Sequence, residues 1–315
     1  MARILANDGI HPAGKAMLEE AGHEVVTDKI AQEDLPAQLP SFDCIVVRSA
    51  TKVRGPLIDV CPDIKVIARA GVGLDNIDVT YAESKGIRVV NTPAASSRSV
   101  AELVFGHFLN VARSLHVTNR AMPTTGATEF SKLKKGASKG IELLNKSVGI
   151  VGFGRIGQEV AKLALGFGMK VLAVDPFVSE TTLNLDIAGQ SLEVPIKTIE
   201  LEELLAQSDF ISLHVPFSGG KPIIGQEELG LLKSTAVIVN ASRGGVIDEE
   251  ALMQAVDNGK ILGSGLDVFV NEPTPDGDLL QCAGISLSPH IGASTSQAQE
   301  NIGTELARKI IALLG

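Results

Sequence analysis

The chain has few of the residues that hold disulfide-rich or metal-centred proteins together. Only three cysteines occur among 315 residues, and they are Cys44, Cys61 and Cys282. Their number is odd and their separations are wide, which argues against a disulfide framework and against metal-ligand spacing. We therefore expect reduced structural thiols in a cytoplasmic protein, and no bound metal.

The chain also lacks a long apolar run and an excess of basic residues. No apolar stretch approaches the roughly 20 residues that cross a bilayer, and the N-terminal residues show no signal-peptide pattern. Lysine and arginine number 28 against 37 aspartates and glutamates, which gives a net charge of −9. This balance argues against nucleic acid and anionic membranes as partners. An anionic ligand would need arginines placed close to it.

Short apolar runs alternate with helical stretches along most of the sequence. The runs are continuously apolar, as expected of parallel strands that are buried on both faces. Strand–helix alternation of this kind predicts right-handed βαβ units in doubly wound α/β domains. The predicted strands cover residues 3–7, 44–47, 65–69, 87–91, 147–152, 170–175, 210–215, 236–241, 261–269 and 285–290.

The alternation is interrupted in the middle of the chain. Residues 97–121 predict one long helix, and the Lys- and Gly-rich residues 124–140 predict a loop. The last helix, about 294–314, is too isolated to belong to the second sheet, so we expect it to pack on the first domain. The predicted domains are 98–293, which binds a dinucleotide, and a discontinuous substrate domain, 1–97 with 294–315.

A glycine motif follows the predicted strand 147–152. In "GFGRIG", Gly152, Gly154 and Gly157 have the G-x-G-x-x-G spacing and lead into a helix. Such glycines let the backbone approach a pyrophosphate, and the helix N-terminus presents N–H groups to it. Asp175 ends the next strand, where an acid accepts hydrogen bonds from a ribose 2′-hydroxyl and repels a 2′-phosphate. The motif therefore predicts NAD rather than NADP.

Three further segments place chemical groups after predicted strands of the same domain. "NASRGG" contains Arg243, which can hold a planar carboxylate. "DVFVNEP" contains Asp267 and Glu272, and "SPHIGAST" places His290 on a rigid turn. A carboxylate beside an imidazole sets its tautomer and stabilises the imidazolium form. We interpret His214, at the end of "FISLHV", as structural, and the remaining histidines have no comparable setting.

These motifs, in this order, resemble the D-isomer-specific 2-hydroxyacid dehydrogenase family over essentially the whole chain. The resemblance implies catalytic roles for Arg243, Glu272 and His290. It implies a Rossmann-type doubly wound parallel sheet inserted in a second, flavodoxin-like α/β domain. It also implies homodimers that form through the nucleotide domain.

Within the family, "VVRSATKV" (46–53) and "ARAGVGLDNID" (68–78) resemble the branch that oxidises D-3-phosphoglycerate to 3-phosphohydroxypyruvate with NAD, the first step of serine biosynthesis. The substrate would then be a small, anionic, phosphorylated hydroxy acid. Residues around its phosphate and carboxylate would be Arg48, Ser49, Lys52, Arg69, Ala70 and Gly71.

The fingerprint and the resemblance together predict the cofactor-binding residues. They are Val72, Gly152, Gly154, Arg155, Ile156, Gly157, Asp175, Val215, Ala241, Arg243, Asp267, His290, Gly292 and Ala293.

The chain departs from the family pattern in three places. Ser96 stands where the family often has asparagine, and no tryptophan occurs in 124–140 because the chain has none. Either Lys134 or Lys135 could supply the basic residue that this segment gives to the partner subunit in relatives. Because the sequence stops at Gly315, we expect no C-terminal regulatory domain.

Other functions remain open on the sequence alone. A hydroxypyruvate/glyoxylate reductase or a D-lactate-type dehydrogenase would share the same catalytic residues. NAD-sensing corepressors share the fold, but a binding protein has no need of a phosphate clamp. The Arg243, Glu272 and His290 set, together with Arg48 and Lys52, therefore favours an enzyme.

Overall fold

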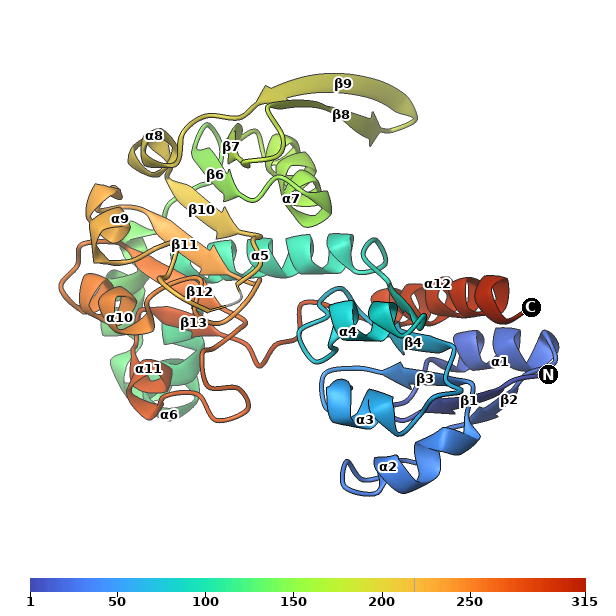
Figure 1. Ribbon diagram of the computed structural model, residues 1–315. Coiled ribbons are helices and arrows are strands. Elements are labelled where there is room, and N and C mark those ends of the chain that lie inside the picture. Colours follow the sequence, from blue (N-terminus) through green and yellow to red (C-terminus); the bar gives the residue numbers. More distant parts are fainter. Residues whose placement is uncertain (218) are drawn as a thin grey trace. The chain divides into compact units, whose positions relative to one another are not determined.

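The structure is a computed structural model that describes residues 1–217 and 219–315. The chain divides into two compact units, and each consists of a parallel sheet covered by helices (Figure 1). Unit 1 comprises residues 1–99 and 293–315, and unit 2 comprises residues 100–292. The α/β class predicted from the alternating runs is confirmed. Among the described residues, no helix is both long and apolar enough to cross a membrane.

Unit 1 contains a sheet of five parallel strands in the order β2-β1-β3-β4-β5. This is the flavodoxin-like order. The strands are β1 (Arg3–Ala6), β2 (Glu24–Val26), β3 (Cys44–Val47), β4 (Val66–Arg69) and β5 (Arg88–Asn91).

Alternate residues of these strands point to opposite faces of the sheet. Ile4 and Ala6 of β1 pack in one cluster, whereas Leu5 packs in another. The first face is covered by α1 (Pro12–Glu20) and α12 (Ser296–Leu314), so the last helix does lie on the first domain. The other face is covered by α2 (Leu35–Gln38), η1 (Leu39–Ser41), α3 (Gly55–Asp59) and α4 (Val79–Ser84).

Unit 2 contains a sheet of six parallel strands in the order β13-β12-β11-β10-β6-β7. The chain reverses direction across the sheet between β6 and β10, which is the switch point of a Rossmann-type fold. The strands are β6 (Ser147–Val151), β7 (Lys170–Val174), β10 (Phe210–Leu213), β11 (Val237–Asn240), β12 (Gly263–Leu266) and β13 (Ile285–Leu287).

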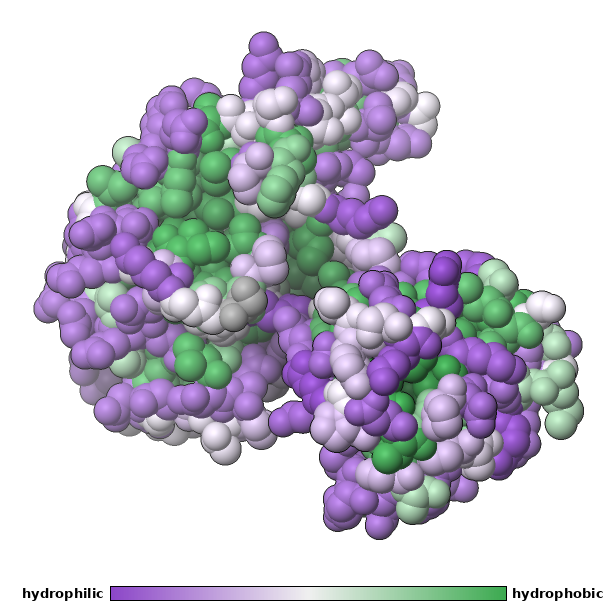
Figure 2. All heavy atoms as spheres, in the orientation of Figure 1, coloured by the Kyte–Doolittle hydropathy of each residue, from purple (hydrophilic) through white to green (hydrophobic). Residues whose placement is uncertain are grey.

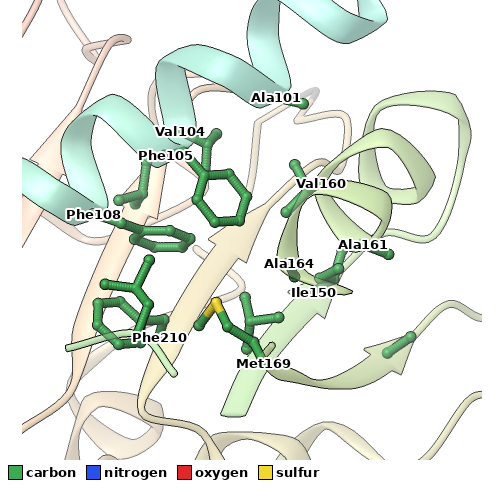
Figure 3. Close-up of a cluster of buried hydrophobic side chains, with 14 of the residues drawn as sticks. Ala101, Val104, Phe105, Phe108, Ile150, Val160, Ala161, Ala164, Met169 and Phe210 are labelled. Carbon is green, nitrogen blue, oxygen red and sulfur yellow. The ribbon is translucent and has the colours of Figure 1, made fainter. Parts of the chain in front are cut away.

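Helices cover both faces of this sheet. On one face, α5 (Ser97–Ala112) packs beside α7 (Arg155–Gly166). In this core the ring of Phe108 of α5 contacts those of Phe105 and of Phe210 of β10 (Figure 3). The opposite face is covered by α8 (Leu201–Gln207), α9 (Gln226–Leu231), α10 (Glu249–Asp257) and α11 (Gly277–Gln281).

An antiparallel hairpin, β8 (Glu180–Ile187) with β9 (Gln190–Lys197), was not predicted. It extends beyond the six-stranded sheet, and its visible surface is mainly hydrophilic (Figures 1 and 2). The two residues of its turn, Ala188 and Gly189, both have positive φ, which is the requirement of a type I′ turn. Leu183 and Leu185 are buried while their neighbours are exposed. This alternation of apolar and polar residues is the pattern in the sequence that indicates the hairpin.

The predicted helix 97–121 and loop 124–140 are both wrong. The helix breaks at Ser114, whose φ is 52°, and a second helix, α6 (Leu115–Gly136), runs through most of the expected loop before the short η2 (Ala137–Lys139). Pro123 lies inside α6 and removes one backbone donor. The hydroxyls of Thr124 and Thr125 donate to the carbonyl of Ala121 at 3.0 and 3.3 Å, a local bond that threonines in helices often make.

Candidate active site

The glycine loop of unit 2 lies between β6 and α7 and leaves no room for side chains. Gly152 has φ of 92°, and a Cβ on it would lie 2.5 Å from the carbonyl oxygen of His214. A Cβ on Gly157 would collide with the carbonyl of Gly152. Only glycine therefore allows the turn at Gly152 and the close packing of α7 against it.

The N-terminus of α7 has the features of an anion site. Its N-cap residue is Gly154, and no side chain caps the first turn. A Cβ on Gly154 would meet nothing within 4 Å, so the space in front of the helix is open. Arg155 is exposed there and Ile156 is half-buried. Backbone N–H groups and the helix dipole suit this space to a pyrophosphate.

Asp175 is attached to the same loop. It follows β7, and its Oδ2 accepts a hydrogen bond from the backbone N–H of Phe153 at 2.8 Å. Its Oδ1 accepts one from the N–H of Phe177 at 2.9 Å. The carboxylate is therefore oriented beside the loop, where an adenosine ribose joined to a bound pyrophosphate would lie. These residues fit NAD.

Arg243 lies in a loop that Asn240 braces at the carboxyl end of β11. The Asn240 amide donates to the Arg243 carbonyl at 2.9 Å and accepts from the Ser242 hydroxyl at 2.7 Å. The Arg243 guanidinium, half-buried, donates to the Ser242 carbonyl at 2.7 Å. Gly244 packs against the carbonyl of Phe269, where a Cβ would collide. The Arg243 loop and the loop after β12 are thus in contact.

Glu272 and His290 form a hydrogen-bonded contact between two loops. Oε2 of Glu272 lies 2.7 Å from Nδ1 of His290, and Oε1 of Glu272 accepts from the N–H of Phe269 at 2.9 Å. The side chain of His290 is 49% exposed and that of Glu272 35%, so the ring is accessible. With Nδ1 directed at the carboxylate, Nε2 is the nitrogen that can exchange a proton with a ligand.

Asp267, 1% exposed, holds the turn that contains His290. Its Oδ1 accepts from the N–H of Ile291 at 2.8 Å and from the hydroxyl of Ser288 at 2.6 Å. Its Oδ2 accepts from the N–H of Gly292 at 2.9 Å. His290 itself has φ of 53°, a conformation that costs energy in a non-glycine residue. Asp267, predicted to bind cofactor, thus braces the turn.

The residues predicted in unit 2 lie at the carboxyl ends of neighbouring strands. Gly152 follows β6, Val215 follows β10, Ala241 follows β11, Asp267 follows β12 and His290 follows β13. These strands are adjacent in the sheet, and this edge is where open α/β sheets bind ligands. Their roles stay predictions.

In unit 1, the predicted substrate residues 48–52 lie on a braced loop after β3. Oδ2 of Asp8 accepts from the N–H groups of Arg48 and Thr51, at 2.7 and 3.0 Å. The Asn76 amide donates to the carbonyls of the same two residues, at 2.8 and 2.6 Å. The side chains of Arg48, Ser49 and Lys52 are exposed. Both Arg48 and Ser49 line a cavity of about 420 Å³.

The other predicted residues of unit 1 in this part of the chain lie at the end of β4 and directly after it. Arg69 folds back over Gly71 and donates to the carbonyl of Ala70 at 3.0 Å. A Cβ on Gly71, whose φ is 146°, would collide with this guanidinium. The carbonyl of Val72 accepts from the Asn91 amide at 2.6 Å. Ala293, predicted to line the cofactor, also belongs to unit 1.

The structure also describes the surroundings of the residues that depart from the family pattern. The hydroxyl of Ser96 is buried and has no hydrogen-bond partner among the described residues. Lys134 and Lys135 are exposed in the last turn of α6.

Two residues that support the site were missed in the sequence. Glu249, in the first turn of α10, accepts from the N–H of Val270 at 2.8 Å and so holds the loop of Glu272. Ser288 links Asp267 to the strand before the turn. The signal for Ser288 was its position directly before Pro289 in the motif that contains His290.

Comparison with known proteins identifies the family. The model of the D-isomer specific 2-hydroxyacid dehydrogenase, NAD binding domain, matches residues 105–292. A hydroxypyruvate reductase of Thermotoga maritima is 45% identical over 99% of this chain and 98% of its own length. A D-3-phosphoglycerate dehydrogenase of Methanocaldococcus jannaschii is 42% identical over 98% of this chain, but this match spans only 57% of that protein.

A solved structure supports the same assignment. The NAD⁺-bound 3-phosphoglycerate dehydrogenase of Entamoeba histolytica superposes with a TM-score of 0.77 at 28% identity, over 99% of this chain and 95% of that one. The chain belongs to the D-isomer specific 2-hydroxyacid dehydrogenases, and its cofactor is NAD.

Proposed function

We propose that this dehydrogenase oxidises D-3-phosphoglycerate to 3-phosphohydroxypyruvate, the first step of serine biosynthesis. The observation that carries the proposal is the braced loop after β3, which presents the exposed cations Arg48 and Lys52 from a rigid backbone. A phosphorylated three-carbon acid has close to three negative charges and is repelled by a chain of net charge −9. Local cations are therefore needed to bind it.

The side chains of unit 2 would perform the chemistry. Nε2 of neutral His290 accepts the proton of the C2 hydroxyl, and Glu272 stabilises the imidazolium that forms. Arg243 holds the substrate carboxylate and stabilises charge at the oxygen on C2. Bound NAD supplies the hydride acceptor. The contact between Glu272 and His290 at 2.7 Å supports this division of roles.

The bracing of residues 48–51 supports a binding role for the loop. Thr51 is 3% exposed, and its hydroxyl donates to Asp8 at 2.8 Å and accepts from Asn7 at 2.9 Å. A loop fixed in this way loses little entropy when it binds an anion, so more of the charge-assisted attraction becomes affinity. An ordinary solvated loop needs no such network.

A hydroxypyruvate reductase is the second candidate. The relative from Thermotoga maritima, which matches over nearly the whole of both chains, favours it. Hydroxypyruvate differs from 3-phosphohydroxypyruvate by the phosphate alone, so the same Arg243, Glu272 and His290 would serve both. The two candidates therefore differ only in whether Arg48 and Lys52 meet a phosphate.

Parallel rate measurements decide between the candidates. Initial rates with NADH would be measured on 3-phosphohydroxypyruvate, hydroxypyruvate and glyoxylate, and with NAD on the matching 2-hydroxy acids, D-3-phosphoglycerate, D-glycerate and glycolate. Our proposal expects kcat/KM to be at least about tenfold higher for the phosphorylated member of each pair, since one charge-assisted contact contributes about 1.5–3 kcal/mol. Equal or higher values for hydroxypyruvate would reject the phosphoglycerate assignment in favour of the second candidate.

We further propose that the protein is a cytoplasmic homodimer formed through unit 2. Helix α6 supports this because it exposes apolar side chains without cover in the chain. Leu115 is 48% exposed, Met122 45% and Phe130 57%. The free, buried cysteines support a reducing compartment.

A further inference from the structure

His107 was set aside in the sequence, but it occupies a buried polar network in unit 2. It lies on α5 and is 3% exposed. The His107 side chain packs over Gly265 of β12. A Cβ added to Gly265 would lie only 2.5 Å from the Cβ of His107. Glycine in "GSGL" therefore lets the imidazole reach the end of the neighbouring strand β13.

Both ring nitrogens of His107 have partners. Nδ1 lies 2.9 Å from Oγ of Ser286, and Nε2 lies 2.9 Å from Oγ of Ser288. The Ser288 hydroxyl donates its only proton to Asp267 at 2.6 Å, so it can only accept from Nε2. His107 must then have its proton on Nε2, and Nδ1 accepts from Ser286. Burial lowers the pKa of His107, although the charge of Asp267 opposes this shift, and the neutral form suits these bonds.

The network ends at the turn that contains His290. Oδ1 of Asp267 accepts hydrogen bonds from both the Ser288 hydroxyl and the Ile291 N–H. Oδ2 of Asp267 accepts one from the Gly292 N–H. These two amides follow His290, whose φ of 53° has to be held by its surroundings. The chain of contacts thus runs from α5 through Ser288 and Asp267 to the backbone on one side of His290.

We infer that His107 is a positioning residue for His290, acting through Ser288 and Asp267. His107 fixes the side chain of Ser288, Ser288 fixes the carboxylate of Asp267, and Asp267 holds the backbone that aims the catalytic ring. His107 touches neither substrate nor cofactor in this role. The inference rests on the proposed function of His290 as proton acceptor, and not on which hydroxy acid is the substrate.

The test compares a variant that keeps the Nε2 donor with one that removes it. His107→Gln places an amide N–H near the position of Nε2, whereas His107→Leu has a similar size and no polar atom. Ser288→Ala breaks the next link and serves if His107→Leu fails to fold. Ser264→Ala is the matched control, because this buried serine of β12 donates to the carbonyl of Ile238 at 2.9 Å and lies outside the network.

Two measurements are made on each variant. The first is kcat and KM on the most active oxo acid of the panel. The second is amide hydrogen exchange of residues 286–292 in the protein without ligands, which reports on the turn independently of catalysis.

We expect His107→Leu and Ser288→Ala each to lower kcat by about tenfold to a hundredfold, because a shift of a catalytic side chain such as His290 by about 1 Å has effects of this size. Exchange at Ile291 and Gly292 should become faster, and KM for NADH should stay within about twofold. His107→Gln should recover most of the rate. The double variant that combines His107→Leu with Ser288→Ala should have a kcat no lower than that of the less active single variant. Both substitutions break the same chain of contacts, so their effects should not add.

A purely structural role would give another result. Additive losses in the double variant, or a fall in kcat with Ser264→Ala as large as with His107→Leu, would overturn the inference. So would unchanged exchange at residues 291–292. His290→Ala separates this failure from that of the proposed function: if it retains full turnover, the role of His290 is wrong, and if it is inactive while His107→Leu is fully active, only the positioning role is wrong.

Discussion

The carboxylate of Asp175 is hydrogen-bonded to the backbone N–H of Phe153, 22 residues earlier, inside the glycine loop. The carboxylate that we predict to face the ribose thus also anchors the loop that we predict to face the pyrophosphate. A substitution at this position changes both, unless the new side chain keeps an oxygen acceptor.

This double role leads to a prediction for Asp175. Asp175→Ala should weaken NADH binding by about ten- to a hundredfold, because it removes charge-assisted bonds of about 1.5–3 kcal/mol. Asp175→Asn keeps an oxygen that can accept from the Phe153 N–H but loses the negative charge. It should therefore reduce the preference for NADH over NADPH, and its loss of NADH affinity should be smaller than that of Asp175→Ala. Fluorescence titrations with both cofactors provide the check. If the wild type already binds both equally, the argument from this carboxylate is wrong.

Turnover should depend on the His290–Glu272 pair. His290→Ala should lower kcat by about 10²–10⁴-fold, the range for loss of a general base, and leave NADH binding nearly intact. Glu272→Gln keeps an oxygen for the Phe269 N–H and removes the charge, so we expect a smaller loss. Stopped-flow rates and NADH titrations measure both. Unchanged turnover in His290→Ala would end the proposed role.

Phosphate recognition should depend on Arg48. Arg48→Ala should lower kcat/KM for the phosphorylated substrate by about ten- to a hundredfold, and barely change activity on D-glycerate. Arg88→Ala is the matched control: Arg88 is also exposed, but it begins β5 at the opposite end of the strands. Steady-state kinetics on both substrates give the comparison. Equal losses on both would assign Arg48 to the fold or to the carboxylate instead.

Acid stability should depend in part on His214. Burial lowers its pKa to about 3 from an ordinary 6.5. As the pH falls from 6.5 toward 3, the unfolded chain binds a proton that the folded chain does not, so the free energy of unfolding decreases. Above 6.5 this contribution is fully present.

The substitution His214→Gln should therefore flatten the dependence of stability on pH. Between pH 6.5 and 4.5, the slope of the free energy of unfolding against pH should be smaller by up to about 1.4 kcal/mol per pH unit. This is the value expected for the uptake of one proton. Urea unfolding at three pH values in this window measures it. The other buried histidines contribute equally to both proteins, so identical slopes would show that His214 is protonated in the folded chain.

Assembly should depend on the exposed face of α6. Phe130→Glu should convert a dimer into a monomer, because it puts a charge into an apolar interface. Ile187→Glu in the β8–β9 hairpin is the control, since Ile187 is 56% exposed against 57% for Phe130. Light scattering after gel filtration gives the mass. A monomeric wild type, or dissociation by Ile187→Glu alone, would contradict the proposed interface.

Much of the fold could be predicted from local pattern. Apolar runs such as "CIVV" predict strands buried on both faces, and the glycine spacing of residues 152–157 predicts the strand–loop–helix that binds NAD. Both signals arise within a few residues and depend on backbone geometry that neighbours in sequence determine. The prediction for residues 124–140 also relied on local pattern, and it was wrong. The Lys and Gly content of these residues predicts a loop, but residues 115–136 form a helix that continues through Pro123.

The sequence by itself determined the parallel strands other than β2, where the glycine turn lies and which residues follow those strands. Only the tertiary structure decided which of those residues meet. Glu272 and His290 come into contact because β12 and β13 are adjacent, and His107 reaches Ser288 because α5 crosses a glycine of β12. Such contacts join residues that are 18 to 181 positions apart. They depend on strand order and helix packing, which no local periodicity encodes.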